Sequence, residues 1–281
     1  EIAVSMGTRA RISLRINPDV DPKTHPYIST GLKSNKFGLD LEQSLEAYTQ
    51  AAALPGIEPV GIDCHIGSQL TTIEPFLEAL SRIILFLDNL KRRGLLIRYL
   101  DLGGGLGITY NTEEPPHPKQ FGEALSKALT GHDLELILEP GRVIAGNAGI
   151  LVTEVVYTKD TPTKHFIIVD AAMNDLIRPA LYNSYHHIGE VTPRHRPPRQ
   201  VDVVGPICES SDFLARDRAL PEVEPGELLA VFSAGAYGFT MSSQYNSRPR
   251  AAELLVDGGQ VILARARERY EDMVALEKGC L

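Results

Sequence analysis

Cysteine, positive charge and long apolar runs are all scarce in this sequence of 281 residues. Its three cysteines, Cys64, Cys208 and Cys280, are far apart and odd in number, which indicates neither a disulfide framework nor a zinc ribbon. The net charge of -8 argues against nucleic acid or an anionic membrane as partner. No apolar run reaches the length of a transmembrane helix, and no signal peptide opens the sequence. These absences predict a protein of the cytoplasm.

Residues 1–146 alternate between short apolar runs and amphipathic stretches. We expect strands over 12–16, 60–65, 97–102 and 134–139, separated by helices over 41–54, 73–93 and 121–129. The helix over 73–93 is the clearest, because Phe76, Leu80, Ile83 and Leu90 fall on one stripe. Such alternation is typical of a parallel sheet with right-handed crossovers.

Residues 147–281 have a different texture, with little helical periodicity. Short β-rich runs lie between turns, at 150–157, 165–170, 200–204, 228–233, 251–256 and 260–265. This pattern predicts a second, mostly antiparallel β domain.

Residues 134–142, LELILEPGR, predict a fully buried strand that stops at a turn, with Glu139 at its carboxyl end. Parallel α/β folds place their chemistry at that end. A buried carboxylate needs a cationic or hydrogen-bonding partner. A protonated pyridine nitrogen would serve Glu139, and so would a Lys or Arg side chain. Gly141 and Arg142 could hold a phosphate.

Gly103, Gly104 and Gly105 follow the third predicted strand. Their backbone could approach a phosphate closely, or they could form a tight turn. A Rossmann site is weakly supported, because no long helix follows directly and no acidic residue stands at the usual offset. His65 ends its own strand in DCHIGSQ and could stack on a ring, act as acid or base, or be structural. Ser68 could bind a phosphate oxygen.

Five further candidates lie in the second half. Arg178 and Tyr182 stand one helical turn apart and could face one ligand, or be a surface Arg and a packed Tyr. Cys208 precedes Glu209 in CESSD, where nearby carboxylates disfavour a thiolate and leave a neutral thiol able to donate a proton. Tyr237, in GAYG, could reach a phosphate or merely pack.

In their joint order these segments resemble the diaminopimelate decarboxylase family of pyridoxal-phosphate enzymes. The matching segments run from end to end: LRINPDVD, HPYISTGLKSNKFG, CHIGSQ, DLGGGLGI, LEPGR, DAAMNDLIRPALYNSYHHI, GPICESSD, GAYG and YEDMVALE. The resemblance implies an α/β plus β fold. Residues 1–146 would be the C-terminal half, strands five to eight, of a (β/α)8 TIM-like barrel. Residues 147–281 would be a mostly antiparallel β domain that completes the active site.

The resemblance also implies roles. His65 would stack on the ring of pyridoxal 5'-phosphate, Glu139 would keep the ring nitrogen protonated, and Cys208 would protonate the intermediate. The cofactor would further be held by Ser68, Gly103, Gly104, Gly105, Gly141, Arg142 and Tyr237. The amino-acid substrate would be bound by Arg142, Arg178, Tyr182, Glu209 and Tyr237. The family pairs as a homodimer with shared active sites.

The substrate follows from two comparisons with similar families. Racemases of this fold carry an Arg at the ring nitrogen, so Glu139 favours decarboxylation. Ornithine enzymes carry an Asp after the corresponding Cys, so Cys208-Glu209 favours meso-2,6-diaminopimelate, with L-lysine as product. The alternatives are a decarboxylase of the ornithine or arginine type and a non-catalytic, decarboxylase-like binding protein.

One family feature is missing from the sequence. The Schiff-base lysine of the family ends the first barrel strand, whereas this sequence opens at Glu1 with what looks like the end of a helix. Lys33 and Lys36 match a family loop and are rejected as substitutes. We therefore expect a C-terminal fragment of a longer protein, inactive by itself.

Overall fold

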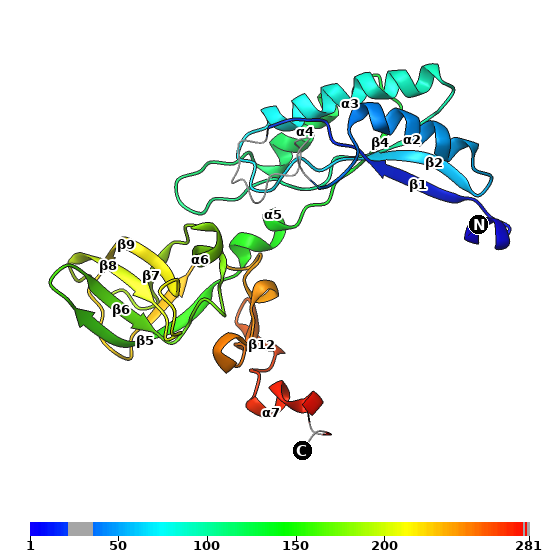
Figure 1. The fold of residues 1–281 in the computed structure, drawn as a ribbon. Coiled ribbons are helices and arrows are strands. Elements are labelled where there is room, and N and C mark those ends of the chain that lie inside the picture. The colour runs from blue at the N-terminus through cyan, green and yellow to red at the C-terminus, as the bar shows by residue number, and fades with distance from the viewer. Residues whose placement is uncertain (22–35, 278, 280–281) are drawn as a thin grey trace. The chain divides into compact units, whose positions relative to one another are not determined.

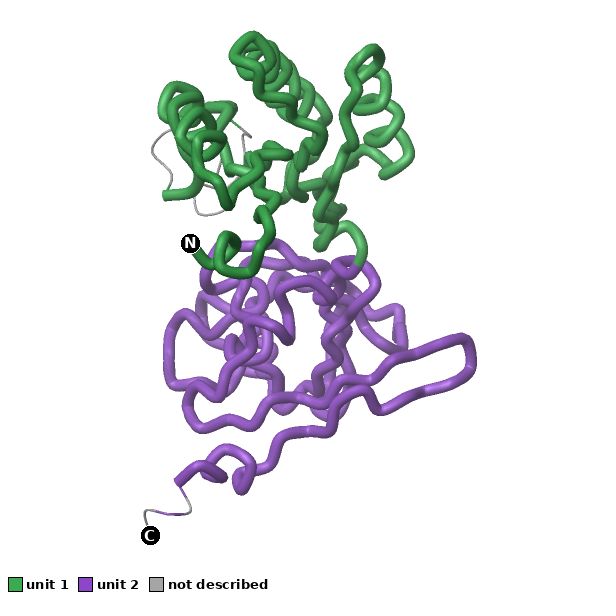
Figure 2. The backbone as a smooth tube through the Cα atoms, turned by 90° about the vertical axis from the view of Figure 1, so that its right-hand side faces the viewer, with its two compact units in different colours: residues 1–144 green, residues 145–281 purple. Residues whose placement is uncertain are grey.

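The computed structural model describes residues 1–21, 36–277 and 279. Two compact units divide the chain, residues 1–144 and residues 145–281 (Figure 2). The sequence had placed this boundary after residue 146. Lys33, in the segment matched to a family loop, lies outside the described residues, and so does Cys280.

The first unit is a parallel sheet with helical crossovers (Figure 1). Its strands, in the spatial order of the sheet, are β1 (Ala10–Arg15), β2 (Ile57–Asp63), β3 (Tyr99–Asp101) and β4 (Glu135–Ile137). Its helices are α1 (Ile2–Ser5), α2 (Leu41–Ala53), α3 (Glu74–Arg92), α4 (Pro118–Ala128) and α5 (Arg142–Ala145). All three strand pairs are parallel, which confirms the TIM-like alternation predicted from the sequence.

The apolar stripe of α3 forms the core of this unit. Phe76, Leu80, Ile83 and Leu90 are buried, and they share one cluster with side chains from α2, α4 and the sheet. Burying each such side chain contributes roughly 1.5–3 kcal/mol. Tyr48 of α2 adds a polar contact, because its hydroxyl donates to the Gly61 carbonyl over 2.6 Å. The helices are therefore fixed against β2 and β3, the strands whose ends carry the candidate site.

The prediction of a fully buried strand before Glu139 is wrong. Within the described residues β4 pairs only with β3, so it is an edge strand. Ile137 and Leu138 are 40% and 37% exposed, and Glu139 is exposed as well. An apolar run predicts burial only where a neighbouring strand covers it, and nothing in the described chain covers the outer edge of β4.

The second unit is a six-stranded sheet with a separate hairpin. The sheet has the order β7-β10-β5-β6-β8-β9, and only β6 and β8 pair in parallel. Its strands are β5 (Leu151–Asp160), β6 (His165–Val169), β7 (Ile188–Glu190), β8 (Pro198–Val204), β9 (Phe213–Pro221) and β10 (Leu228–Val231). The hairpin is β11 (Glu253–Asp257) and β12 (Gln260–Arg265). The mostly antiparallel β domain is thus confirmed.

The helices of the second unit are short. They are η2 (Gly146–Ala148), α6 (Arg178–Tyr182), η3 (Phe239–Met241), η4 (Tyr245–Ser247), α7 (Tyr270–Met273) and η5 (Ala275–Glu277). None of the helices in the part of the chain that the structure describes has the length and apolarity needed to cross a membrane.

Candidate active site

Three loops at the carboxyl ends of neighbouring strands carry the candidates of the first unit. His65 follows β2 by two residues, Gly103 follows β3 by two, and Glu139 follows β4 by two. The loops are bonded to one another, since the Glu139 backbone N–H donates to the Gly103 carbonyl over 2.9 Å. The structure therefore brings together residues that stand 36 to 38 positions apart between successive strands in the sequence.

The imidazole of His65 is oriented by the glycine turn. The backbone N–H of Gly104 donates to His65 Nδ1 over 3.2 Å, so the neutral ring carries its proton on Nε2. Burial, and then the charge of Arg15, lower the pKa of His65 below its ordinary value. The ring is thus neutral at pH 7, the form suited to lie against a cofactor ring and not to repel its cationic nitrogen.

Each of the three glycines is needed for close packing. A Cβ at Gly103 would lie 2.6 Å from His65 Nδ1, and one at Gly104 would overlap the Glu139 carbonyl oxygen. Gly105 has φ +105, and its Cβ would overlap the carbonyl oxygen of Gly67. The triplet therefore joins the loops after β2, β3 and β4.

Two of the three glycine amides are already bonded within the protein. Besides the Gly104 contact with His65, the Gly103 N–H donates to Asp101 Oδ1 over 2.8 Å. The prediction that a backbone N–H group of this turn binds a phosphate is accordingly kept for Gly105 alone.

Arg142, which follows β4, contacts side chains from the loops after β2 and β3. The residue is 7% exposed, and its guanidinium has Nη1 2.6 Å from the Tyr110 hydroxyl and Nη2 2.9 Å from Ser68 Oγ. Two predicted cofactor ligands, Ser68 and Arg142, thus contact each other directly. Gly141 is exposed and stands immediately before α5.

Two carboxylates near Glu139 escaped the sequence analysis. Asp63 ends β2 and Asp101 ends β3. Burial, and then the charges of Asp101 and Glu139, raise the pKa of Asp63 to about 6, against the opposing charge of Arg15 at 4.0 Å. The signal was available, because both aspartates stand within two residues of the ends of predicted strands.

In the second unit Arg178 and Tyr182 are the first and last residues of α6. Arg178 is 5% exposed, so the alternative of a surface arginine is wrong. Its Nη1 lies 2.9 Å from Nε2 of His186, a residue the sequence analysis did not single out. The burial of Arg178 leaves no periodic signal in a helix of only five residues.

Cys208 and Glu209 lie in the loop between β8 and β9, and Cys208 is exposed. Glu209 accepts hydrogen bonds from the Ser211 hydroxyl and, over 2.7 Å, from the Tyr245 hydroxyl. These bonds, Ser211 first, hold the pKa of Glu209 below its usual value. The carboxylate is therefore ionised and oriented. The loop itself is fixed by Asp212, which accepts the Ile207 N–H over 2.7 Å.

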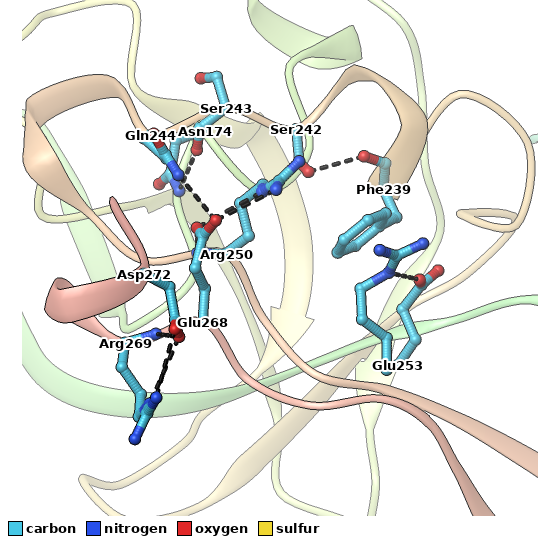
Figure 3. Close-up of polar contacts among 11 residues, drawn as sticks. Asn174, Phe239, Ser242, Ser243, Gln244, Arg250, Glu253, Glu268, Arg269 and Asp272 are labelled. Carbon is cyan, nitrogen blue, oxygen red and sulfur yellow. Dashed lines mark hydrogen bonds and ion pairs between the residues drawn. The ribbon is translucent and has the colours of Figure 1, made fainter. Parts of the chain in front are cut away.

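The segment that carries Tyr245 is anchored on both sides (Figure 3). Before Tyr245, Gln244 Nε2 donates to Glu268 Oε1 over 2.7 Å, and Asn174 Nδ2 donates to the Ser243 carbonyl over 3.3 Å. After it, the Arg250 N–H donates to Glu268 Oε2 over 3.0 Å. Glu268 thereby joins the base of the hairpin to the residues around Tyr245.

Tyr237 lies in a turn of the second unit between two glycines. Its φ of +59 is left-handed, and the side chain is 42% exposed. An unfavourable backbone angle at an exposed tyrosine is the kind of feature that accompanies a binding role.

An imidazole, a glycine turn and a carboxylate thus lie on adjacent parallel strand ends, and an antiparallel β unit follows them in the chain. Residues 2–146 match the family model described as the pyridoxal binding domain of pyridoxal-dependent decarboxylases, and the chain belongs to this family. The cofactor of the family is pyridoxal phosphate.

Several relatives of the chain share a more specific name within this family. The chain is 55% identical over 278 residues to the diaminopimelate decarboxylase of Vibrio cholerae. The match covers 99% of this chain and 66% of the relative. The Archaeoglobus fulgidus enzyme of the same name is 47% identical, covering 99% and 68%. The diaminopimelate decarboxylase of Helicobacter pylori, solved with L-lysine, superimposes with a TM-score of 0.94 at 46% identity, covering 100% of this chain and 70% of that one. The chain thus spans about two thirds of the length of its relatives.

Proposed function

We propose that the chain is part of a decarboxylase that converts meso-2,6-diaminopimelate into L-lysine and carbon dioxide with pyridoxal 5'-phosphate. The observation that carries the proposal is the contact of His65, Gly104 and Glu139 on three adjacent strand ends. The substrate is supported by the shared name of relatives that match 98–100% of the chain.

The charge of this edge fits the cofactor. Burial, and then the negative charges of Asp101 and Glu139, raise the pKa of Asp63. A cationic ring nitrogen beside Glu139 would relieve that repulsion. Bound pyridoxal 5'-phosphate would supply a sink for the electron pair left when carbon dioxide departs.

The residues of the first unit would bind and orient this group. Glu139 would hold a proton at the ring nitrogen, and the neutral His65 would pack against the ring. Gly105, Gly141 and Tyr237 would serve the phosphate. Ser68 and Arg142, already bonded to each other, would do so by keeping the loops after β2 and β4 in place.

The residues of the second unit would recognise the substrate and deliver a proton. Arg178 and Tyr182 would bind a carboxylate at the distal end of the amino acid, with Arg142 from the first unit. Glu209, ionised and oriented by Tyr245, would bind the distal ammonium. Cys208 would donate a proton to the carbon that loses its carboxylate, a role for which its exposed thiol is accessible.

The assay of the full-length protein tests this function. Loaded with pyridoxal phosphate, it should release carbon dioxide and L-lysine from meso-diaminopimelate far faster than it releases carbon dioxide from ornithine or arginine. A higher kcat/KM for either of those two amino acids would replace the proposed substrate, and no turnover of any of them would favour a non-catalytic binding protein.

The domains and the assembly belong to the same proposal. Residues 1–146 would be part of the cofactor-binding barrel and residues 147–281 would complete the active site, in a cytoplasmic homodimer with shared sites. Mixing a Cys208→Ala parent with a Glu139→Ala parent tests the sharing. If Cys208 serves the partner's cofactor, half of randomly paired dimers have one intact site of two, so activity should return to about a quarter of normal. Verified heterodimers without recovered activity would assign Cys208 to its own subunit.

A further inference from the structure

A buried histidine stands behind the arginine assigned to the substrate. His186 is fully buried at 0% exposure, and its Nε2 lies 2.9 Å from Nη1 of Arg178. Its other nitrogen, Nδ1, lies 2.9 Å from the carbonyl oxygen of Phe232. Both ring nitrogens of a buried imidazole are thus engaged, with a guanidinium on one side and the main chain on the other.

The two partners fix the protonation of the ring. A guanidinium only donates hydrogen bonds, so Nε2 must present its lone pair to Arg178. A carbonyl oxygen only accepts, so Nδ1 must carry the proton given to Phe232. His186 is therefore the neutral Nδ1–H tautomer, and its hydrogen-bond acceptor points at the arginine.

The backbone around the ring is fixed as well. The Phe232 N–H donates to the His187 carbonyl over 2.8 Å, so Phe232 is bonded to the segment of His186 through both its amide and its carbonyl. Arg218 Nη1 donates to the His186 carbonyl over 2.9 Å. The imidazole of His186 is consequently held in one orientation.

We propose that His186 is a positioning residue that sets the guanidinium plane of Arg178 for a substrate carboxylate. The inference rests on the proposed function, in which Arg178 binds that carboxylate. An arginine side chain loses rotamer entropy when it is ordered. A contact that orders the side chain before the substrate arrives removes part of that cost from binding.

Two substitutions in the full-length holoenzyme separate positioning from packing. His186→Asn places its amide nitrogen near Nδ1 and keeps the donor to Phe232, but has no group at the Nε2 position. His186→Gln can place its amide oxygen near Nε2 and keep the acceptor for Arg178. We expect the Asn variant to raise KM for meso-diaminopimelate about ten-fold with kcat nearly unchanged, and the Gln variant to recover most of that loss. Equal KM values for the two variants, or KM changes that follow their melting temperatures, would overturn the proposal.

Inhibition by two related ligands gives a readout that general damage would not move. L-Lysine has a carboxylate and cadaverine has none. His186→Asn should weaken inhibition by L-lysine about ten-fold and leave inhibition by cadaverine unchanged. Equal weakening of both inhibitors would assign His186 a structural role only.

The Arg178→Ala background distinguishes this inference from the function on which it rests. There, adding His186→Asn should change KM no further, because the group being positioned is gone. If Arg178→Ala alone left KM unchanged, the substrate role of Arg178 would fall. If Arg178→Ala raised KM while His186→Asn behaved as the parent, the positioning role alone would fall.

Discussion

Gly104 donates its backbone N–H to Nδ1 of His65, a residue 39 positions earlier in the chain. The contact has two effects at once. It selects the Nε2–H tautomer of the imidazole, and it holds the turn after β3 against the loop after β2. The imidazole of His65 is therefore oriented by main chain, which has no rotamers to lose.

Gly104→Ala should destabilise the protein, because the new Cβ would overlap the Glu139 carbonyl oxygen, which belongs to backbone. Overpacking of this kind costs roughly 1–3 kcal/mol. Gly122→Ala, in α4, is the matched control, since no described heavy atom lies within 4 Å of the new Cβ and the helix should gain up to about 1 kcal/mol. Urea unfolding of both variants measures the difference, and equal stability would contradict the close approach.

Asp63→Asn should stabilise the cofactor-free protein at pH 7 but not at pH 4. The pKa of Asp63 is raised from 3.8 to about 6 in the fold, so between these values the folded state holds the proton and the unfolded chain does not. The free energy of unfolding of the parent therefore falls as pH rises from 4 to 6, by roughly 1–3 kcal/mol.

The asparagine variant should lack that fall, and its advantage should persist above pH 6. Asp88→Asn, an exposed change of the same charge on α3, serves as control. Parallel stability curves for Asp63→Asn and the parent across pH 4–7 would remove Asp63 from this role.

Glu139→Gln in the full-length protein should lower kcat far more than cofactor affinity. An amide leaves a ring nitrogen free to lose its proton, which weakens the electron sink, while the phosphate contacts remain. The two quantities are measured separately, by turnover and by titration with pyridoxal phosphate. Parent-like turnover would take Glu139 out of the mechanism.

Glu209→Ala should raise KM for meso-diaminopimelate, since a site built to bond a polar group rejects ligands strongly when that bond is lost. Tyr245→Phe should have a smaller effect in the same direction, because it removes the 2.7 Å hydrogen bond and leaves the one from Ser211. The pKa of Glu209 should move back toward its usual value in this variant. An unchanged KM in both variants would show that Glu209 does not bind the substrate.

The 281-residue chain alone should form neither L-lysine nor a stoichiometric borohydride-stable adduct with pyridoxal phosphate. Neither Lys33 nor Lys36 matches the lysine-bearing strand of the family, and Lys36 lies over the Phe37 ring, 4.9 Å from its centroid. Peptide mapping after reduction provides the check. A single product trapped on Lys33 or Lys36 would show that this lysine forms a Schiff base with the cofactor.

Much of the fold followed from short-range pattern. The stripe of Phe76, Leu80 and Ile83 predicted α3 to within one residue at each end, because amphipathic period and helix packing depend on the same residues. By contrast, β9 was missed, since Arg216, Asp217 and Arg218 interrupt its apolar alternation. β9 pairs with β8, the strand before it, and this pairing outweighs the charged residues in the middle of β9.

The candidate site was predictable in part for the same reason. His65 and Glu139 stand at strand ends, where position alone suggests chemistry. His186 and Tyr245 do not, because their importance comes from contacts with Arg178 and Glu209, 8 and 36 positions away. Such pairs become visible only when the turns between them are placed.

The bonds of Arg142 bear on how the protein folds. They join it to Tyr110, 32 positions earlier, and to Ser68, 74 positions earlier. Contacts of such sequence separation form slowly, because chain entropy is lost before they repay it. During synthesis Ser68 and Tyr110 emerge well before Arg142. The loops after β2 and β3 can therefore form these hydrogen bonds only after Arg142 has been added. The bonds of Arg142 are for this reason late products of folding, and a nascent chain halted before residue 142 would have the helices and core of the first unit without them.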